Sequence, residues 1–275
     1  MDWQGKVAVV TGGASGIGRA ICDQLAKGEA RVIVADINGE AAETAAMQIV
    51  QAGGHAEAAT VDVTDSSAVT KLVDGTISSY GKLDYIFNNA GIAIIGEVRD
   101  MSLDQWQRII DVNLYGVLHG TRAAYPRMIE QGHGHIVNMA SLAGLAPMTF
   151  GAAYSTTKHA VVGLSTSMRA EGADRGVNVS VVCPGFIDTP LKRVSTFLGV
   201  DRSKMLANFP FKFHDPKYCA RVLLRGVRRN KAVITVTPFA AFAWLLFRFS
   251  PSLMIWAGKF GVRRARATYR GRKED

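Results

Sequence analysis

The chain has 275 residues, of which 48% are hydrophobic and 20% are charged, and this composition supports a packed core and excludes a disordered chain. Its cysteines, Cys22, Cys183 and Cys219, are too few and too scattered for a disulfide framework or a structural zinc site. The net charge is +9, but residues 248–275 hold 8 basic and 2 acidic residues, so the basicity belongs to a C-terminal tail and does not indicate nucleic-acid binding.

Apolar runs alternate with helical patterns along most of the chain. The expected strands are residues 6–11, 31–36, 56–61, 83–87, 135–139, 177–182 and 232–236. The helical patterns between them include residues 16–28, 38–52, 103–130 and 152–174. Continuous apolar strands separated by helices predict an α/β fold, a Rossmann-type doubly wound parallel sheet of about seven strands with helices on both faces. We expect residues 1–237 to form one such domain and residues 238–275 to form an extension.

A glycine-rich turn separates the first expected strand from the first expected helix. Gly12, Gly16 and Gly18 are spaced Gly-x-x-x-Gly-x-Gly, which permits a tight turn and lets a pyrophosphate approach the helix N-terminus. Asp36 ends the second strand. A carboxylate there can accept hydrogen bonds from the ribose hydroxyls of NAD and would repel the 2′-phosphate of NADP. The alternative is that Asp36 is only a helix cap or a turn residue.

Further motifs follow the glycine-rich turn in a fixed order. They are Asp62-Val63, Asn88-Asn89-Ala90-Gly91, Asn113, Ser141, Tyr154-x-x-x-Lys158, Pro184-Gly185 and Thr189. Each is weak by itself, but the ordered set resembles the short-chain dehydrogenase/reductase family over roughly residues 5–237. The resemblance implies an oxidoreductase that transfers hydride to or from a nicotinamide cofactor.

The resemblance also implies four catalytic residues. Tyr154 and Lys158 are four residues apart and share a helix face. A phenol has a pKa of about 10, and a nearby ammonium together with the positive nicotinamide ring would lower it, which would make Tyr154 a general acid/base. Ser141 would bind the substrate oxygen, and Asn113 would maintain a water-linked proton path to the lysine. The alternatives are a surface tyrosine with a solvated lysine, a strand-end serine, and an asparagine that satisfies helix backbone groups.

The expected cofactor is NAD, and no metal site is expected, because the histidines show no convincing ligand spacing. The resemblance and the glycine-rich turn together predict a cofactor site that spans the sheet domain. Its residues are Gly12, Ser15, Gly16, Ile17, Gly18, Asp36, Asp62, Val63, Asn89, Ala90, Gly91, Tyr154, Lys158, Pro184, Gly185, Ile187 and Thr189. Asn88 is instead a candidate for tying strands together.

The substrate is expected near residues 189–216, where the family places its substrate loop. The apolar side chains of this segment either line a pocket or cover the core. They are Leu191, Phe197, Leu198, Met205, Leu206, Phe209, Phe211 and Phe213. The leading hypothesis is NAD-dependent interconversion of a hydrophobic secondary alcohol and its ketone. The alternatives are a 3-oxoacyl-thioester reductase, against which Asp36 argues, and a non-catalytic NAD-sensing or membrane-associated protein.

The extension is first apolar and aromatic and then basic. Residues 239–247 form an apolar run, which Arg248 and Pro251 separate from a second apolar run at residues 253–257. The segment is therefore too short and too interrupted for a membrane span. The aromatic residues and the cations that follow suit an interfacial segment on an anionic membrane, and the alternative is packing on the body or on a second subunit. These cations are Arg263, Arg264, Arg266, Arg270, Arg272 and Lys273. With no apolar signal region at the N-terminus, we expect a cytoplasmic protein. If the extension is an interfacial segment, the protein would also be peripheral to a membrane. The resemblance implies a homodimer or homotetramer.

Overall fold

The computed structural model describes residues 3–269, so the predicted cations Arg270, Arg272 and Lys273 lie outside the described residues. A seven-stranded parallel sheet with the order β3-β2-β1-β4-β6-β7-β9 forms the centre. Its strands are β1 (Val7–Thr11), β2 (Arg31–Asp36), β3 (His55–Thr60), β4 (Tyr85–Asn88), β6 (Gly134–Met139), β7 (Val177–Cys183) and β9 (Val233–Thr235). The order reverses between β1 and β4, which is the topology of a doubly wound fold, and the predicted fold class is confirmed.

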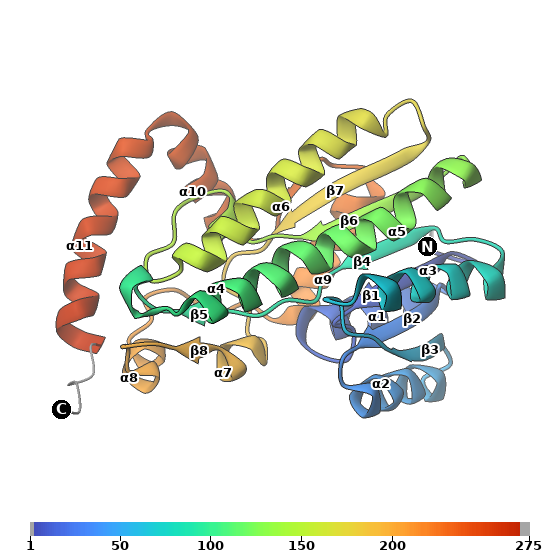
Figure 1. Cartoon of the computed structure of the whole chain (residues 1–275), viewed down its shortest axis with the longest axis horizontal. Helices are drawn as coiled ribbons and strands as arrows, with labels where there is room; N and C mark the ends of the chain where they lie inside the picture. Colours follow the sequence, from blue (N-terminus) through green and yellow to red (C-terminus); the bar gives the residue numbers. More distant parts are fainter. Residues whose placement is uncertain (1–2, 270–275) are drawn as a thin grey trace.

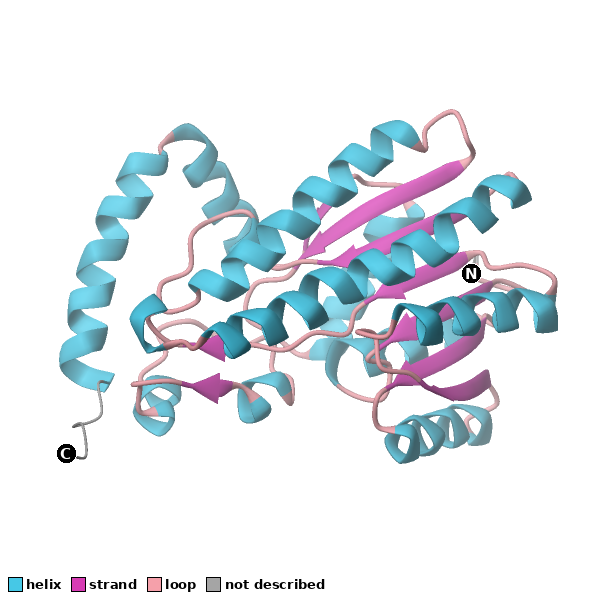
Figure 2. Ribbon diagram, in the orientation of Figure 1, coloured by secondary structure: helices cyan, strands magenta, loops and turns pink. Residues whose placement is uncertain are grey.

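Helices cover both faces of the sheet (Figures 1 and 2). One face carries α1 (Gly16–Lys27), α2 (Gly39–Gln51) and α9 (Pro216–Arg228), and the other carries α3 (Ser66–Tyr80), α5 (Gly116–Gln131) and α6 (Ala152–Glu171). Each face has its own apolar layer, with Leu25 and Leu223 buried on the first and Val73 and Met128 buried on the second. The central strands are buried on both sides, which explains the continuous apolar runs of β1 and β2.

The edge strand β3 differs from the prediction. The strand expected at residues 56–61 is present as β3, which spans His55–Thr60, but most of its side chains are exposed and it is not a continuous apolar run. It pairs only with β2 along its length. An edge strand has one hydrogen-bonding side open, so its residues need not be apolar.

The expected helix at residues 103–130 is interrupted. It consists of α4 (Leu103–Ile110), a π-helical turn at η2 (Asp111–Tyr115), and α5. A capping box between Ser102 and Gln105 starts α4. The π turn inserts an additional residue into the helix, a feature that is frequent at functional sites. Asn113 lies in this turn and is fully buried.

Short elements that the sequence pattern did not predict lie beyond the carboxyl ends of the strands. The pair β5 (Ile94–Ile95) and β8 (Thr196–Phe197) forms a small parallel sheet. The others are η1 (Val98–Asp100), η3 (Leu142–Gly144), α7 (Leu191–Val194) and α8 (Arg202–Ala207). They surround the side of the molecule where ligands bind in doubly wound folds.

Two helices follow the sheet, α10 (Pro238–Phe249) and α11 (Pro251–Tyr269). Figure 1 shows α11 standing beside the body, at the end of the molecule that carries α8. Within residues 3–269 we find no single helix that is long and apolar enough to cross a membrane, although α10 and α11 meet that test as a pair bent by 119°.

Candidate active site

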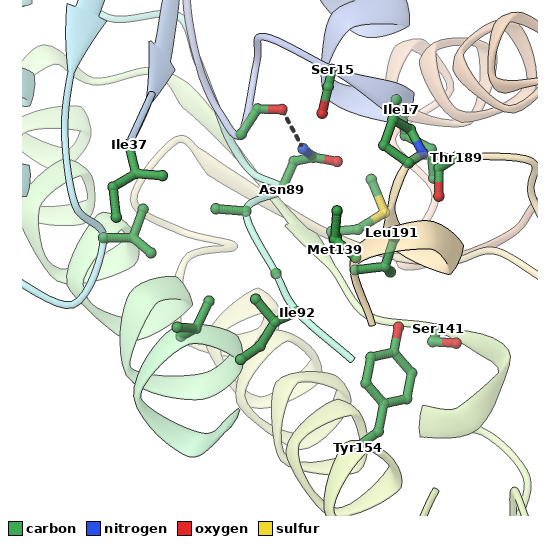
Figure 3. Close-up of a pocket in the computed structure, with 18 of the residues that line it drawn as sticks. Ser15, Ile17, Ile37, Asn89, Ile92, Met139, Ser141, Tyr154, Thr189 and Leu191 are labelled. Carbon is green, nitrogen blue, oxygen red and sulfur yellow. Dashed lines mark hydrogen bonds between the residues drawn. The ribbon is translucent and has the colours of Figure 1, made fainter. Parts of the chain in front are cut away.

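A cavity of about 980 Å³ opens at the carboxyl ends of the strands, at the reversal between β1 and β4 (Figure 3). This is where doubly wound folds bind ligands, and its volume is at the upper end of the range for small-molecule sites. All the predicted site residues line it except Gly18 and Asn113, which lie directly behind its wall. The structure therefore brings together side chains that are spread from residue 12 to residue 189.

The glycine-rich turn forms a cradle with no room for side chains. Gly12 and Gly16 have φ values of +62° and +55°, a conformation that glycine adopts without strain. A Cβ on Gly18 would lie 2.0 Å from the carbonyl oxygen of Gly12, so this position requires glycine as well. The Asn89 side chain secures the turn by donating to the carbonyl oxygens of Thr11 and Gly12 at 2.9 and 3.2 Å.

The N-terminus of α1 points into the cavity. Ser15 occupies the N-cap without making a side-chain cap hydrogen bond, and the first turn contains no acidic residue. The helix dipole and the open backbone N–H groups favour an anion there. Thr189 comes from the opposite wall, with its side chain 3.3 Å from the position of a Cβ on Gly16. The turn, the helix end and the covering threonine fit the diphosphate of a dinucleotide.

Two carboxylates follow along the same wall. Asp36 accepts hydrogen bonds from the backbone N–H groups of Ala14 and Asn38, each at 3.1 Å. These bonds fix the carboxylate where it lines the cavity. Asp62 is held in the same way by the backbone N–H and the hydroxyl of Thr64, at 2.9 and 2.8 Å. Each oxygen accepts more than one hydrogen bond, so both carboxylates retain capacity for ribose or adenine groups.

Tyr154 and Ser141 face one another at the other end of the cavity (Figure 3). Burial raises the pKa of the Tyr154 phenol above its ordinary value, and a hydrogen bond with the Ser141 hydroxyl opposes this rise. In the protein alone, desolvation of the phenolate outweighs the Ser141 hydrogen bond. Tyr154 is therefore a protonated phenol there. The lowering expected from Lys158 and a positive nicotinamide ring together stays a prediction.

Lys158 lies beneath the phenol and is 3% exposed. Its Nζ lies 5.6 Å from the centre of the Tyr154 ring and donates to the carbonyl oxygen of Met139 at 2.9 Å. Burial lowers the pKa of its ammonium to about 8. A lysine in this position is a titrating group inside the site and not the solvated surface residue of the alternative interpretation.

Asn113 fixes the strand-end segment that covers Lys158. Its side chain accepts from the backbone N–H of Ile92 at 2.8 Å and donates to the carbonyl oxygen of Ile92 at 2.9 Å. A Cβ on Gly91 would lie 3.1 Å from Asn113 Oδ1 and 3.6 Å from Lys158 Nζ. Asn113 thus neighbours the lysine, but its own hydrogen bonds satisfy the backbone, so the structure shows a positioning contact.

Asn88 holds two neighbouring strands together, which is the role that the sequence suggested for it. It is buried, and its Nδ2 donates to Asn138 Oδ1 at 2.8 Å, which connects β4 to β6. The residue after it, Asn89, faces the cavity instead. Successive residues at the end of β4 therefore divide into one that holds the sheet and one that lines the site, as the alternation of side chains along a strand dictates.

Several cavity residues were missed by the sequence interpretation. They are Ile37, Val61, Thr64, Ile92, Asp104, Gln107, Arg108, Asp111, Val112, Met139, Ala140, Pro190 and Val194. Ile37 carried a signal, because it is a large apolar residue directly after Asp36 and is 68% exposed. The α4 residues carried none, since a charged helix face usually indicates solvent.

Most of the apolar residues of the expected substrate loop lie away from the cavity. Leu191 lines it, whereas Phe209 and Phe211 pack against Phe186, with ring centres 4.7 and 5.1 Å apart. Phe211 also contacts Phe239 at the start of α10, at 4.5 Å. The aromatic residues of the loop therefore form a cluster that connects it to α10, and the alternative of covering other residues describes them better than a pocket lining.

The known proteins that this chain resembles are dehydrogenases and other oxidoreductases. The sequence model for short chain dehydrogenases matches residues 6–196. A putative oxidoreductase, SadH, of Mycobacterium tuberculosis is 34% identical over 240 residues, covering 86% of this chain and 87% of that protein. The 2,5-dichloro-2,5-cyclohexadiene-1,4-diol dehydrogenase LinX of Sphingobium indicum is 36% identical over 187 residues, covering 68% of this chain and 75% of that protein. A short-chain dehydrogenase/reductase from Burkholderia phymatum, solved in complex with NAD, superposes with a TM-score of 0.81 at 27% identity, covering 92% of this chain and 96% of that one.

Proposed function

Because the chain belongs to the short-chain dehydrogenase/reductase family, whose members are oxidoreductases, we propose that it is an NAD-dependent enzyme that interconverts a hydrophobic secondary alcohol and its ketone. The observation that carries the proposal is the pairing of the Tyr154 phenol with the Ser141 hydroxyl in the cavity that also holds Asp36 and the glycine-rich turn. One cavity thus contains a proton donor, a hydrogen-bonding partner and a dinucleotide cradle.

The residues of the cradle fit a nicotinamide dinucleotide. The glycines let the turn pack tightly against Ala90 and Asn89, which lets a diphosphate approach the N-terminus of α1. Asp36 is fixed by two backbone N–H groups, with acceptor capacity left for ribose hydroxyls. A carboxylate at this position supports NAD over NADP. The bound cofactor would supply or accept the hydride. The solved relative that contains NAD has 27% identity to this chain and supports the same assignment.

Tyr154 would move the proton. Its raised pKa means that the phenol is protonated near neutral pH, so in the reductive direction it can donate to the oxygen of the forming alkoxide. In the oxidative direction the phenolate accepts the hydroxyl proton. The Ser141 hydroxyl would hydrogen-bond the same oxygen and would stabilise the charge that develops on it.

Lys158 would assist without touching the substrate oxygen. When it is protonated, its buried ammonium below the phenol favours phenolate. Its pKa of about 8 makes this assistance dependent on pH in the neutral to alkaline range. Asn113 would act as a positioning residue, because it holds Ile92 and lies behind Gly91 next to the lysine.

The substrate end of the cavity is partly apolar. Ile92, Met139, Leu191 and Val194 line the cavity and favour an apolar alcohol or ketone. LinX, the relative named for a chlorinated cyclic diol, is 36% identical and supports a secondary alcohol. We also propose a homodimer or homotetramer paired through the long helices α5 and α6, which sedimentation as a monomer at micromolar concentration would contradict.

The test is NADH formation from NAD by the purified protein, with alcohols graded from short alkyl to aryl to polycyclic. Wild type would be compared with Tyr154→Phe and with Tyr115→Phe, a matched loss of one hydroxyl from a tyrosine that is 45% exposed and outside the cavity. We expect activity that rises with apolar size, vanishes in Tyr154→Phe and persists in Tyr115→Phe. Activity that survives in Tyr154→Phe would refute the assignment, and activity only with ketones or thioesters would redirect it to reduction.

A further inference from the structure

The helices α10 and α11 form a C-terminal arm whose orientation on the body is fixed. Arg266 makes a bidentate salt bridge to Glu97, with its Nε and Nη2 each 3.0 Å from a carboxylate oxygen. On the same side of α11, Gly258 and Val262 are half-buried, and Val262 lines a small cavity against residues 96–99, 148–150 and 152. This inner side of α11 therefore faces the body, which determines the side that faces outward.

The outward side of each helix is an apolar stripe. In α10 the stripe is Phe242, Leu245 and Phe249, and in α11 it is Leu253, Trp256 and Phe260, all between 49% and 82% exposed. In both helices the spacing is i, i+3 and i+7, which places the three side chains on one face. The Trp256 and Phe260 rings contact one another at 4.8 Å. A surface helix of a globular protein usually presents the opposite arrangement, with polar residues outward.

The charge of the arm has one sign. Residues 238–269 contain five cations, Arg248, Lys259, Arg263, Arg264 and Arg266, and not one aspartate or glutamate. Lys259, Arg263 and Arg264 are exposed. Each lies three or four residues from Trp256 or Phe260, so these cations border the apolar stripe of α11. Apolar and aromatic side chains flanked by arginine and lysine are the composition of a helix that lies in a membrane interface.

We propose that the arm docks on the surface of a bilayer that contains anionic phospholipid, with the two stripes in the headgroup and acyl boundary and the cations on the lipid phosphates. The 119° bend and the cations within α11 fit a helix pair that lies on the membrane, not one that crosses it. The arm contacts α8 within the expected substrate loop, so docking would hold that loop beside the bilayer. The proposal concerns binding and does not depend on the proposed function.

The experiment is co-sedimentation of the purified full chain with two kinds of vesicle, phosphatidylcholine alone and an equimolar mixture with phosphatidylglycerol. A stripe variant carries Leu253→Ser, Trp256→Ser and Phe260→Ser, and a charge variant carries Lys259→Glu, Arg263→Glu and Arg264→Glu. All six side chains are exposed, so thermal unfolding should match wild type. The matched controls, Met47→Ser with Val50→Ser and Lys71→Glu, change exposed residues on α2 and α3.

We expect binding to the mixed vesicles that weakens with added salt, because surface charges are screened. Each cation near an anionic surface is worth about fivefold in partitioning, so the charge variant should bind at least about 100-fold more weakly. The stripe variant should also lose binding, and the controls should not change. The proposal is overturned if wild type does not bind the mixed vesicles. It is also overturned if wild type binds both kinds of vesicle equally and the charge variant behaves like wild type. If the stripe variant instead dissociates an oligomer, the arm is a protein interface and the proposal is wrong.

Discussion

Replacing Asp36 by asparagine tests the cofactor assignment without knowledge of the substrate. The substitution keeps the size of the side chain and removes its charge. Asp36 is half-buried, lines the cavity and accepts from the N–H groups of Ala14 and Asn38 at 3.1 Å. The amide retains one oxygen as an acceptor, but its nitrogen accepts none. One ribose hydroxyl or one of these backbone groups therefore loses its partner.

The magnitude follows from the two interactions that change. A hydrogen bond to a charged group contributes about 1.5–3 kcal/mol, so NADH binding should weaken about tenfold or more. For NADPH the removed charge no longer repels a phosphate of about two negative charges. At about 5 Å and a solvent-like dielectric, which suits a half-exposed group, that repulsion is about 1.5 kcal/mol. NADPH binding should therefore strengthen about tenfold, and the preference should change about 100-fold in total.

The assay is titration of the purified protein with NADH and NADPH, monitored by cofactor fluorescence. Asp62→Asn is the matched control, because Asp62 also lines the cavity and is also held by local hydrogen bonds from Thr64. We expect this control to change both affinities by a similar factor and to leave their ratio intact. Wild-type protein that prefers NADPH, or an unchanged ratio in Asp36→Asn, would refute the reasoning.

Three further predictions follow from single contacts. Gly18→Ala places a Cβ 2.0 Å from the Gly12 carbonyl oxygen, so the turn must shift. Loss of one backbone hydrogen bond to the diphosphate, about 1.5 kcal/mol, should lower the NADH affinity measured by fluorescence about tenfold or more, and unchanged binding would contradict the cradle. Burial lowers the pKa of His135 to about 4, whereas the unfolded state takes up a proton near pH 6.5. The free energy of unfolding should therefore fall by about 3 kcal/mol between pH 7 and pH 4. Urea unfolding of His135→Asn should lack most of this loss. Ser141→Ala removes the hydrogen bond that lowers the pKa of Tyr154, so the alkaline rise of kcat/KM for alcohol oxidation should move to higher pH, and a profile that moves to lower pH would contradict that role.

The sheet was predictable because parallel buried strands leave a strong apolar signal. Both faces of the central strands are covered, so β1 and β2 appear as continuous apolar runs, and β6 and β7 are buried strands rich in apolar residues. The edge strand β3 does not share this cause, which explains its exposed residues. The two-residue pairing of β5 with β8 joins segments about a hundred residues apart, and so little local sequence carries no periodic signal.

The sequence predicted site residues that follow the strands, but not the α4 residues that complete the cavity wall. Parallel strands bring these strand-end residues to one edge of the sheet. The helical contributions were not predictable in the same way. The π turn at η2 shifts the helix register, so a regular period cannot show that Asn113 is fully buried. Arg108 lines the cavity from α4, although its sequence context is that of a solvated helix face.

The substrate loop shows why apolar content does not by itself define a pocket. Phe209 and Phe211 were candidates for substrate contact, yet they pack with Phe186 and Phe239. Aromatic rings gain from specific ring-to-ring contacts, so the cluster forms where the fold brings these rings together, even though Phe211 and Phe239 stay partly exposed. Leu191 lines the cavity in their place. Selectivity among apolar substrates should therefore respond first to the size of Leu191, while changes in the aromatic cluster should act through the stability of the loop and of α10.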